Sequence, residues 1–382
     1  MTSKREVWAA LMVIFLLTVM ARASYLTSDY EETEKEKPPP ERVIPPRPAN
    51  PLVELVRRVD VRAPYHYRGL SVYLLELSSP TDRTSYLSTQ EAITRGLLKV
   101  REKGNGAVPQ LVVENAGDRK ILMISGELLL GGKQNRVLGQ DVLLPPHSGP
   151  VEVPVRCIEQ GRWSRARGNF KARQSVAPPA VRGAAQAGRS QGEVWEGVKR
   201  YQKQLEVDSG TRDLQAVHDS PEIKKDLKKY RDHVSRHCWR PSAVGMVVAR
   251  YGRVLGADIF CNSKVFSKHR NRLLESYALD CIAYRRNHSG ERWHRPSKSL
   301  AEKFLQRVYT GEFSWEPGAG DGRLLSVTGR RITGKALISG DRALHAGLFP
   351  RSLVIIRPEP PHPRPLPPTP VPVPHRERGD QE

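Results

Sequence analysis

The residues of this chain that are best suited to chemistry concentrate between Leu111 and Trp163. In this stretch the segment GELLLGGKQNR places a glutamate before a Gly-Gly turn and four polar side chains after it. Arginine can hold phosphate or carboxylate through two parallel hydrogen bonds, and glutamate can act as a general base. This combination suits an anionic ligand that also carries hydrogen-bonding groups. The candidate residues are Glu127, Lys133, Gln134 and Arg136.

The same spacing also allows a purely structural interpretation. Glu127 and Arg136 would then pair with each other in a polar turn and contact no ligand. The residues alone leave both interpretations open.

A second polar block, VPVRCIEQGRW, follows about 25 positions later and holds Cys157, Glu159, Gln160, Arg162 and Trp163. Strand alternation would place Cys157 and Glu159 on one face. A carboxylate near a thiol disfavours the reactive thiolate, so we expect a structural or disulfide-bonded Cys157 rather than a nucleophile. Trp163 is either a stacking platform or the edge of a core.

The four cysteines are Cys157, Cys238, Cys261 and Cys281. In an exported chain they allow up to two disulfides, and a bridge from Cys261 to Cys281 is the simplest pairing. His218 and His237-Cys238 lack zinc-ligand spacing, so we expect neither a metal nor another cofactor. His345, beside Asp341 and Arg342, is more typical of a structural histidine. The familiar hydrolase, metalloprotease and nucleotide-binding motifs are missing from the sequence.

The elements that would position these residues come as runs of strands with inserted helices. This order predicts an α+β fold with mostly antiparallel sheet. The expected strands are Leu52–Val61, Leu70–Leu77, Gln110–Asn115, Ile121–Ile124, Leu128–Leu130, Asp141–Leu144, Val151–Ile158, a hairpin turning at Arg250–Arg253, Leu324–Thr328, Thr333–Ser339 and Leu353–Ile356. The expected helices are Thr89–Val100, capped by Ser88 with Glu91, then Glu193–Leu205, Pro221–His237, Ser263–Tyr284 and Leu300–Tyr309.

Both ends of the chain are typical of segments outside a folded core. Residues 1–23 resemble a secretory signal peptide, with Lys4 and Arg5 before an apolar run and a small-x-small cleavage motif after it. A permanent N-terminal membrane anchor is the alternative. Residues 24–51 and 357–382 are Pro-rich and predicted to be disordered, which leaves a single domain over 52–356. Within it, residues 164–190 resemble a mobile low-complexity loop.

Because of the signal-like N-terminus, we expect a periplasmic or extracellular protein.

The formal net charge of +21 raises the possibility of polyanion binding. The basic residues are spread over linkers and helix faces, and no nucleic-acid-binding motif accompanies them. Nucleic acid is therefore not the expected partner. The Pro-rich tails could instead reach protein or cell-envelope partners.

The order of several segments resembles the domain family named for its association with ADP-ribosylglycohydrolases and rhodanese-type phosphatases. These segments are SYLSTQEAITRGLLKVREKG, LVVENAGDRKILMISGELLLGGKQNR, VPVRCIEQGRW, VLGADIFC and LHAGLF. The resemblance covers roughly 52–356 and implies a connection with ADP-ribose-related compounds. It also implies that the candidate residues of both polar blocks share one site, with Cys157 beside them.

The leading hypothesis is thus an exported domain that binds, and in one version processes, a small phosphorylated or nucleotide-like ligand. Arginine and lysine would hold its anionic oxygens, and Glu127 or Glu159 would serve as general base. One alternative is a non-catalytic envelope-associated binding or scaffold module. Another is a nonspecific polyanion binder.

Overall fold

The structure is a computed structural model that describes residues 50–104, 109–162, 167–288, 293 and 295–354. The predicted signal segment, nearly all of the predicted tether, the C-terminal tail and Trp163 lie outside these residues. The fold is α+β with mostly antiparallel sheet, as the sequence predicts.

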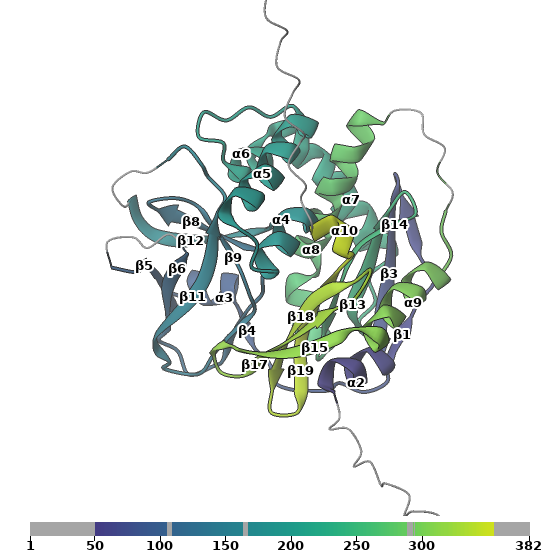
Figure 1. The fold of residues 1–382 in the computed structure, drawn as a ribbon, viewed down its shortest axis with the longest axis horizontal. Coiled ribbons are helices and arrows are strands. Elements are labelled where there is room, and N and C mark those ends of the chain that lie inside the picture. The colour runs from purple at the N-terminus through teal and green to yellow at the C-terminus, as the bar shows by residue number, and fades with distance from the viewer. Residues whose placement is uncertain (1–49, 105–108, 163–166, 289–292, 294, 355–382) are drawn as a thin grey trace, which may run out of the picture. The chain divides into compact units, whose positions relative to one another are not determined.

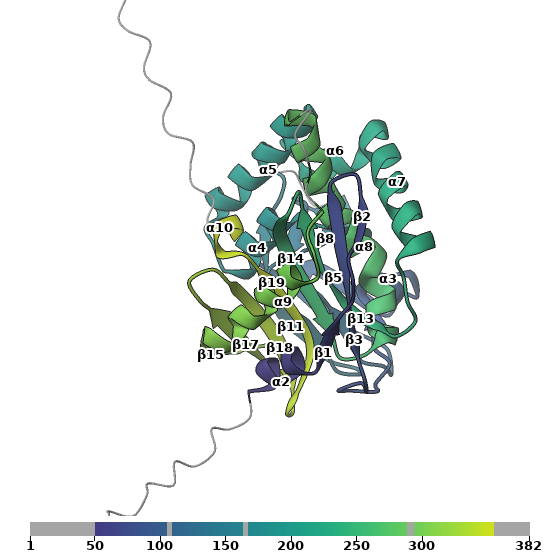
Figure 2. The same ribbon diagram turned by 90° about the vertical axis from the view of Figure 1, so that its right-hand side faces the viewer.

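A nine-stranded antiparallel sheet forms the larger half of the described fold. Its strands run in the order β1-β3-β13-β14-β19-β18-β17-β15, and β2 pairs with β3 beside helix α7 (Figure 2). Their bounds are β1 Val59–Val61, β2 Tyr65–Tyr67, β3 Leu70–Leu77, β13 Ala243–Arg250, β14 Arg253–Phe260, β15 Glu312–Pro317, β17 Arg323–Thr328, β18 Thr333–Ser339 and β19 Arg342–Phe349.

Both faces of this sheet are covered, which explains why its central strands are apolar at nearly every position. On β3, Leu70, Val72 and Leu74 join one buried cluster, and Tyr73 and Leu75 join the cluster on the opposite face. The helices that contact strands of this sheet are α2 Pro51–Arg57, α4 Pro179–Gln186, α7 Pro221–His237, α8 Ser263–Asn287 and α9 Ser299–Gln306. The elements that pack against these helices are α5 Gln191–Leu205, α6 Leu214–Asp219, the 3₁₀ turn η1 Arg307–Thr310 and α10 Arg351–Val354.

The strands of a six-stranded antiparallel sheet, with the segments that follow β8 and β11, carry the candidate residues that the structure describes. Its order is β12-β8-β9-β11-β6-β5, and its edge strands β5 and β12 lie side by side, so the sheet curls toward a barrel. Figure 1 shows this barrel-like sheet on the left and the nine-stranded sheet on the right, with α8 contacting both. Its strands are β5 Leu98–Glu102, β6 Gln110–Asn115, β8 Glu127–Gly132, β9 Arg136–Leu138, β11 Gly149–Cys157 and β12 Arg167–Val176.

A small four-stranded sheet completes the fold. It contains β4 Leu87–Ser88, β7 Ile121–Met123, β10 Val142–Leu144 and β16 Ala319–Gly320, in the order β16-β10-β7-β4. The short helix α3, Thr89–Thr94, begins directly after β4. Ser88 and Glu91 form the capping box that the sequence predicts.

Four expected elements are wrong. The predicted strand over residues 52–61 begins as helix α2, because Asn50 caps Leu52 and Val53 through hydrogen bonds of 3.1 Å to their backbone N–H groups. The predicted helix over 89–100 ends at Thr94, and β5 follows. The expected low-complexity loop 164–190 contains β12 and α4. The predicted strand near Leu353 is helix α10.

The four cysteines are free thiols and all are buried, so the expected Cys261–Cys281 bridge is absent. Burial raises the pKa of Cys157 to about 11 and those of Cys238, Cys261 and Cys281 to about 12. Within the described ranges, no helix is long and apolar enough to cross a bilayer.

Candidate functional site

Arg136 lies at the start of β9 with its side chain inside the curled six-stranded sheet. It pairs with Cys157 on β11 and with Leu129 on β8. Leu138, two residues further along β9, packs with Leu129 and Val155 in the interior of this sheet. Since side chains two apart share a face of a strand, Arg136 occupies the polar end of an otherwise apolar interior. Its side chain is 0% exposed.

The guanidinium of Arg136 is only partly hydrogen-bonded. Nη1 donates to Gln134 Oε1 at 3.3 Å, and Nη2 lies 3.9 Å from Glu102 Oε2. Nε and Nη2 make no hydrogen bond within the described structure, nor does Glu102 Oε2. Most buried polar groups in proteins are satisfied, so a buried cation with two unused donor atoms is an unusual feature.

The Gly131-Gly132 turn brings Glu102 close to the backbone of β8. Lys133 N–H donates to Glu102 Oε1 at 2.8 Å. Gly132 has φ +54°, and a Cβ added there would lie 2.4 Å from the Phe170 ring and 2.5 Å from Glu102 Oε1. Only glycine therefore fits at this position. The absence of a side chain at Gly132 lets the carboxylate of Glu102 come close to the backbone. Glu102 was not among the residues selected from the sequence.

Cys157 is held as a neutral thiol beside this arginine. Its Sγ donates to Gln134 Oε1 at 2.9 Å, and its backbone exchanges hydrogen bonds with the side chain of Gln191. Burial and the carboxylate of Glu102 outweigh the opposing effect of Arg136 on the pKa of Cys157. A thiol with a pKa of about 11 is not a nucleophile at neutral pH.

Glu159 is already fully engaged with neighbouring protein groups. Arg162 binds both of its oxygens, through Nε at 2.8 Å and Nη2 at 2.7 Å. Asn135 N–H donates to Oε2 at 3.1 Å, and Gln134 Nε2 donates to the main-chain oxygen at 2.9 Å. A carboxylate held in this way positions its neighbours and has little capacity left to act as a general base.

Asp213 is a buried carboxyl next to these residues whose pKa is raised toward neutral pH, and it was not predicted from the sequence. It caps helix α6 by accepting from Gln215 N–H at 3.0 Å, and it accepts from Asn135 Nδ2 at 2.7 Å. Burial, with a further contribution from Glu159, raises the pKa of Asp213 to about 6. The sequence signal was an aspartate directly before the apolar-periodic segment that forms α6.

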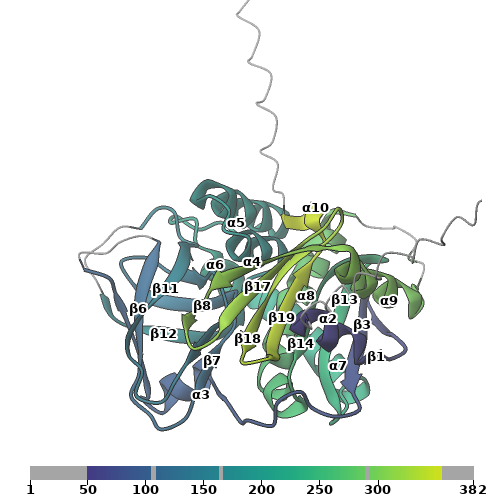
Figure 3. The same cartoon turned by 60° about the horizontal axis from the view of Figure 1, so that its bottom comes forward.

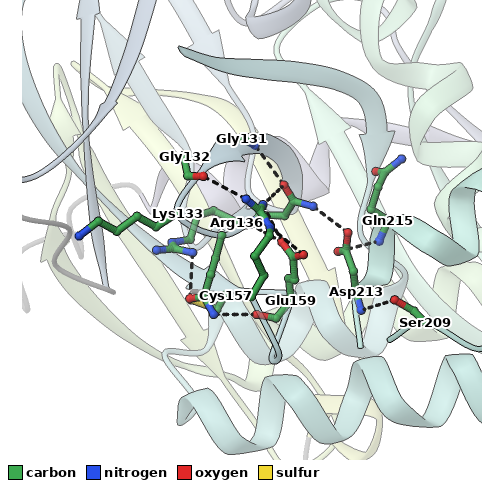
Figure 4. Close-up of polar contacts among 12 residues, drawn as sticks. Gly131, Gly132, Lys133, Arg136, Cys157, Glu159, Ser209, Asp213 and Gln215 are labelled. Atoms are coloured by element: carbon green, nitrogen blue, oxygen red, sulfur yellow. Dashed lines mark hydrogen bonds and ion pairs between the residues drawn. The ribbon is translucent and has the colours of Figure 1, made fainter. Parts of the chain in front are cut away.

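Together these residues form one group, which we call the Arg136 cluster. Figure 4 shows Arg136, Cys157, Glu159 and Asp213 close together, while the side chain of Lys133 extends away from them. The members of the cluster are Glu102, Gln134, Asn135, Arg136, Cys157, Glu159, Arg162 and Asp213.

Two predicted ligand-binding residues lie at its edge or outside the structure. Gln160 is exposed and accepts a hydrogen bond from Arg212 at 3.0 Å, without contacting Arg136. Trp163 falls outside the described residues. Gln160 therefore does not contribute to the geometry of the cluster.

Glu127 does not belong to the cluster. It accepts a hydrogen bond from Thr89 and forms an ion pair of 2.9 Å with Arg272 on α8. The alternative pairing of Glu127 with Arg136 is therefore also wrong. Glu127 is the first residue of β8, and the three residues Leu128 to Leu130 of extended chain separate it from the Gly131-Gly132 pair.

A second group of buried charges, the Asp258 network, connects the nine-stranded sheet to helices α4 and α8 and to the chain next to β7 and β10. Asp258 on β14 binds Arg182 on α4, and both ring nitrogens of His345 face carboxylates, Asp141 at 2.7 Å and Asp258 at 3.1 Å. Burial alone would lower the pKa of His345, but the two aspartates raise it to about 9. The network consists of Ser125, Asp141, Arg182, Asp258, Tyr277 and His345.

His345 thus lies against partners remote in sequence, not beside Asp341 and Arg342 as its neighbours suggested. It is fully buried, in keeping with a structural histidine. The signal for this network was Asp258 itself, an isolated acid within the apolar strand VLGADIF.

No group of three or more His, Cys, Asp or Glu side chains in the described part is arranged to hold a metal ion. Comparison with curated proteins found no match, and comparison with solved structures found none either. One family model matches residues 58–349, nearly the whole described fold, and it is the family that the sequence segments resemble. The chain belongs to the family of the ARG and Rhodanese-Phosphatase-superfamily-associated Protein domain.

Proposed function

We propose that this domain binds a small phosphorylated or nucleotide-like anion at the Arg136 cluster. The observation that carries the proposal is the buried guanidinium of Arg136, whose Nε and Nη2 have no hydrogen-bond acceptor among the described residues. Leaving a buried donor unsatisfied costs about 1–3 kcal/mol, and more for a charged group. A ligand with two adjacent anionic oxygens would recover this energy through a bidentate contact.

Access to Arg136 requires a local rearrangement. Its side chain is fully buried, and the Glu102 carboxylate lies on one side of it at 3.9 Å. An incoming phosphate would repel Glu102 and replace it beside the guanidinium. We therefore expect binding to be coupled to movement of Glu102 away from Lys133 N–H, to which it is now bonded.

Binding is better supported than turnover. Cys157 is a neutral thiol, and Glu159 is occupied by Arg162 and Asn135. Asp213, with a pKa of about 6, is the cluster carboxyl best placed to exchange a proton near neutral pH. Any processing of the ligand would start from Asp213 rather than from Glu127 or Glu159.

Calorimetric titration with ADP-ribose, nucleotides and sugar phosphates tests the proposal. The Arg136→Met variant keeps the length of the side chain and removes the charge and the donors. We expect wild type to bind at least one of these compounds and Arg136→Met to lose tenfold or more in affinity. Arg212→Gln, which removes a nearby exposed guanidinium, is the matched control. Flat titrations with every compound would remove the proposal.

A scaffold role is the second candidate, and it is favoured because both oxygens of Glu159 are already hydrogen-bonded to protein groups. In addition, the hydrogen bond from Asn135 to Asp213 connects the β8–β9 turn to α6. In that case Arg136→Met lowers thermal stability and no ligand restores it. Nonspecific polyanion binding would instead fall steeply with salt and would not respond to Arg136→Met.

Export of the chain is also a proposal, and it rests on residues 1–23, whose sequence is typical of a signal peptide. Fusing these residues to a reporter that is active only outside the cytoplasm tests it. Replacing Lys4 and Arg5 with glutamate should abolish the signal. A reporter that stays inactive with the native segment would contradict export.

A further inference from the structure

A separate polar pocket lies between helix α4 and the end of the nine-stranded sheet. Its volume is about 220 Å³, below the roughly 300–1,000 Å³ of sites for drug-sized ligands. Helix α4 lies beside β18 and α10 there, as Figure 3 and the contacts of these elements agree. None of the residues that line this pocket belongs to the Arg136 cluster.

One face of three adjacent strands supplies the floor of this pocket. Alternation along β15, β17 and β18 brings hydroxyl, carboxylate and ammonium groups to the same side. These residues are Ser314, Glu316, Ser326, Thr328, Thr333 and Lys335. Most sheet faces that pack beneath a helix are apolar, so this concentration of hydrogen-bonding groups is not explained by packing.

Gln186 supplies a buried polar atom without a partner. The residue is 3% exposed, and its Nε2 donates to Gly347 O at 3.2 Å and to Lys335 O at 3.4 Å. Its Oε1 makes no hydrogen bond in the described structure. Gln186 lines the pocket, and because its amide nitrogen is bonded to two carbonyl oxygens, its Oε1 remains as a buried acceptor next to the pocket.

The charges of the pocket favour an anion. Lys335 is paired with Glu316 at 2.5 Å, and that pair together with Ser326 keeps the pKa of Glu316 below its usual value despite burial. Arg189 and Arg351 also line the pocket. Arg189 lies 4.0 Å from Glu193, and its buried Nε makes no hydrogen bond within the described residues. The pocket lining thus holds three cations and one carboxylate, and Glu193 lies beside Arg189 outside the lining.

We propose that this pocket is a second ligand site, which binds a small molecule carrying both hydroxyl groups and a phosphate, such as a sugar phosphate. Arg189 and Lys335 hold the phosphate oxygens, and the serine and threonine hydroxyls pair with the sugar. Gln186 Oε1 accepts from one ligand hydroxyl. The pocket volume suits a single sugar ring with its phosphate rather than a dinucleotide.

Calorimetric titration of the full chain with ribose 5-phosphate, ribose and inorganic phosphate tests this site. Ribose 5-phosphate should bind at least tenfold more tightly than either fragment, since it alone uses both the cations and the hydroxyls. Arg189→Gln and Lys335→Met should each weaken it at least tenfold. Thr333→Val, which replaces a hydroxyl with a methyl group of similar size, should weaken it several-fold.

The controls separate this site from the Arg136 cluster. Arg330→Gln removes an exposed arginine from the same β17–β18 hairpin, outside the pocket, and should leave the affinity unchanged. In Arg136→Met any binding at the Arg136 cluster is lost, so the binding of ribose 5-phosphate that remains is that of this pocket. Binding that is lost in Arg136→Met but intact in Arg189→Gln would overturn the second site and support the first. The absence of any heat with ribose 5-phosphate would overturn the second site alone.

Discussion

Arg136 and Arg182 are both buried arginines, yet the surrounding protein treats them differently. All three nitrogens of Arg182 donate hydrogen bonds, Nε to Ser125 O and the two terminal nitrogens to Asp258. Arg136 donates one weak bond to Gln134, and its nearest carboxylate stands at 3.9 Å. The hydrogen-bonding groups of Arg182 are thus satisfied within the fold, whereas Nε and Nη2 of Arg136 have no acceptor among the described residues. This difference separates a structural charge from a candidate binding group.

Removing Arg182 should have the largest effect on stability. Arg182→Met leaves Asp258 buried without its cation, and breaking such a pair costs about 3–5 kcal/mol. Denaturant unfolding measures the loss. The double variant Arg182→Met/Asp258→Asn should recover part of it, because no uncompensated charge then remains. A loss below about 1 kcal/mol in the single variant would show that the network is not structural.

The Asp258 network should also give stability its own pH dependence at alkaline pH. The folded-state pKa of His345, about 9, lies above its ordinary value of 6.5. The stabilisation is therefore complete below pH 6.5 and is lost as pH rises through 9, by up to about 3 kcal/mol. Urea midpoints of wild type and His345→Gln across this range test it. Parallel curves for the two proteins would contradict it.

The Arg136 cluster should also make the free energy of unfolding fall as pH rises, but over a more acidic range than the Asp258 network. The pKa of Asp213 rises from 3.8 to about 6 on folding, so the folded state holds this proton more tightly. Its contribution is present below pH 3.8 and is lost as pH rises to 6, by about 3 kcal/mol at most. Asp213→Asn should flatten this part of the stability profile. An unchanged slope in the variant would place the titration elsewhere.

Arg136→Met should have the smallest effect on the unliganded protein. Arg136 makes only one weak hydrogen bond and a 3.9 Å ion pair, and Glu102 keeps its hydrogen bond from Lys133 N–H in the variant. We therefore expect a change of about 1 kcal/mol or less in the free energy of unfolding. The same denaturant titrations used for Arg182→Met measure it. A cost as large as that of Arg182→Met would remove the distinction between the two arginines and favour the scaffold role.

Local signals predicted much of the fold. Helix α7 has the predicted bounds, Pro221–His237, because Pro221 can start a helix and the apolar positions recur at helical spacing. Gly252 has φ +78° in the β13–β14 turn, the conformation a tight hairpin requires. By contrast, the prediction of a loop over residues 164–190 was wrong. Alanine and glycine suggested low complexity there, but in α4 these small residues allow close packing against neighbouring elements.

The candidate site was harder to predict because its contacts are remote in sequence. Asn135 and Asp213 are 78 positions apart, and Arg182 and Asp258 are 76 apart. Strand periodicity predicted only that Cys157 and Glu159 share a face, and it was the family resemblance that implied their proximity to Arg136. It could not show that Glu127, on the same strand as the Gly-Gly turn, would contact α8. That outcome depends on which helix packs against β8, which no local pattern specifies.

The four free thiols affect whether the chain can refold after it has been unfolded. Once the chain is unfolded, four cysteines can combine into two disulfides in three ways, and none of these pairings exists in the native state. Under oxidising conditions each would trap the chain in a wrong shape. Heating without a reducing agent should therefore be irreversible, whereas the intact fold is protected by keeping its sulfurs out of reach of the oxidant.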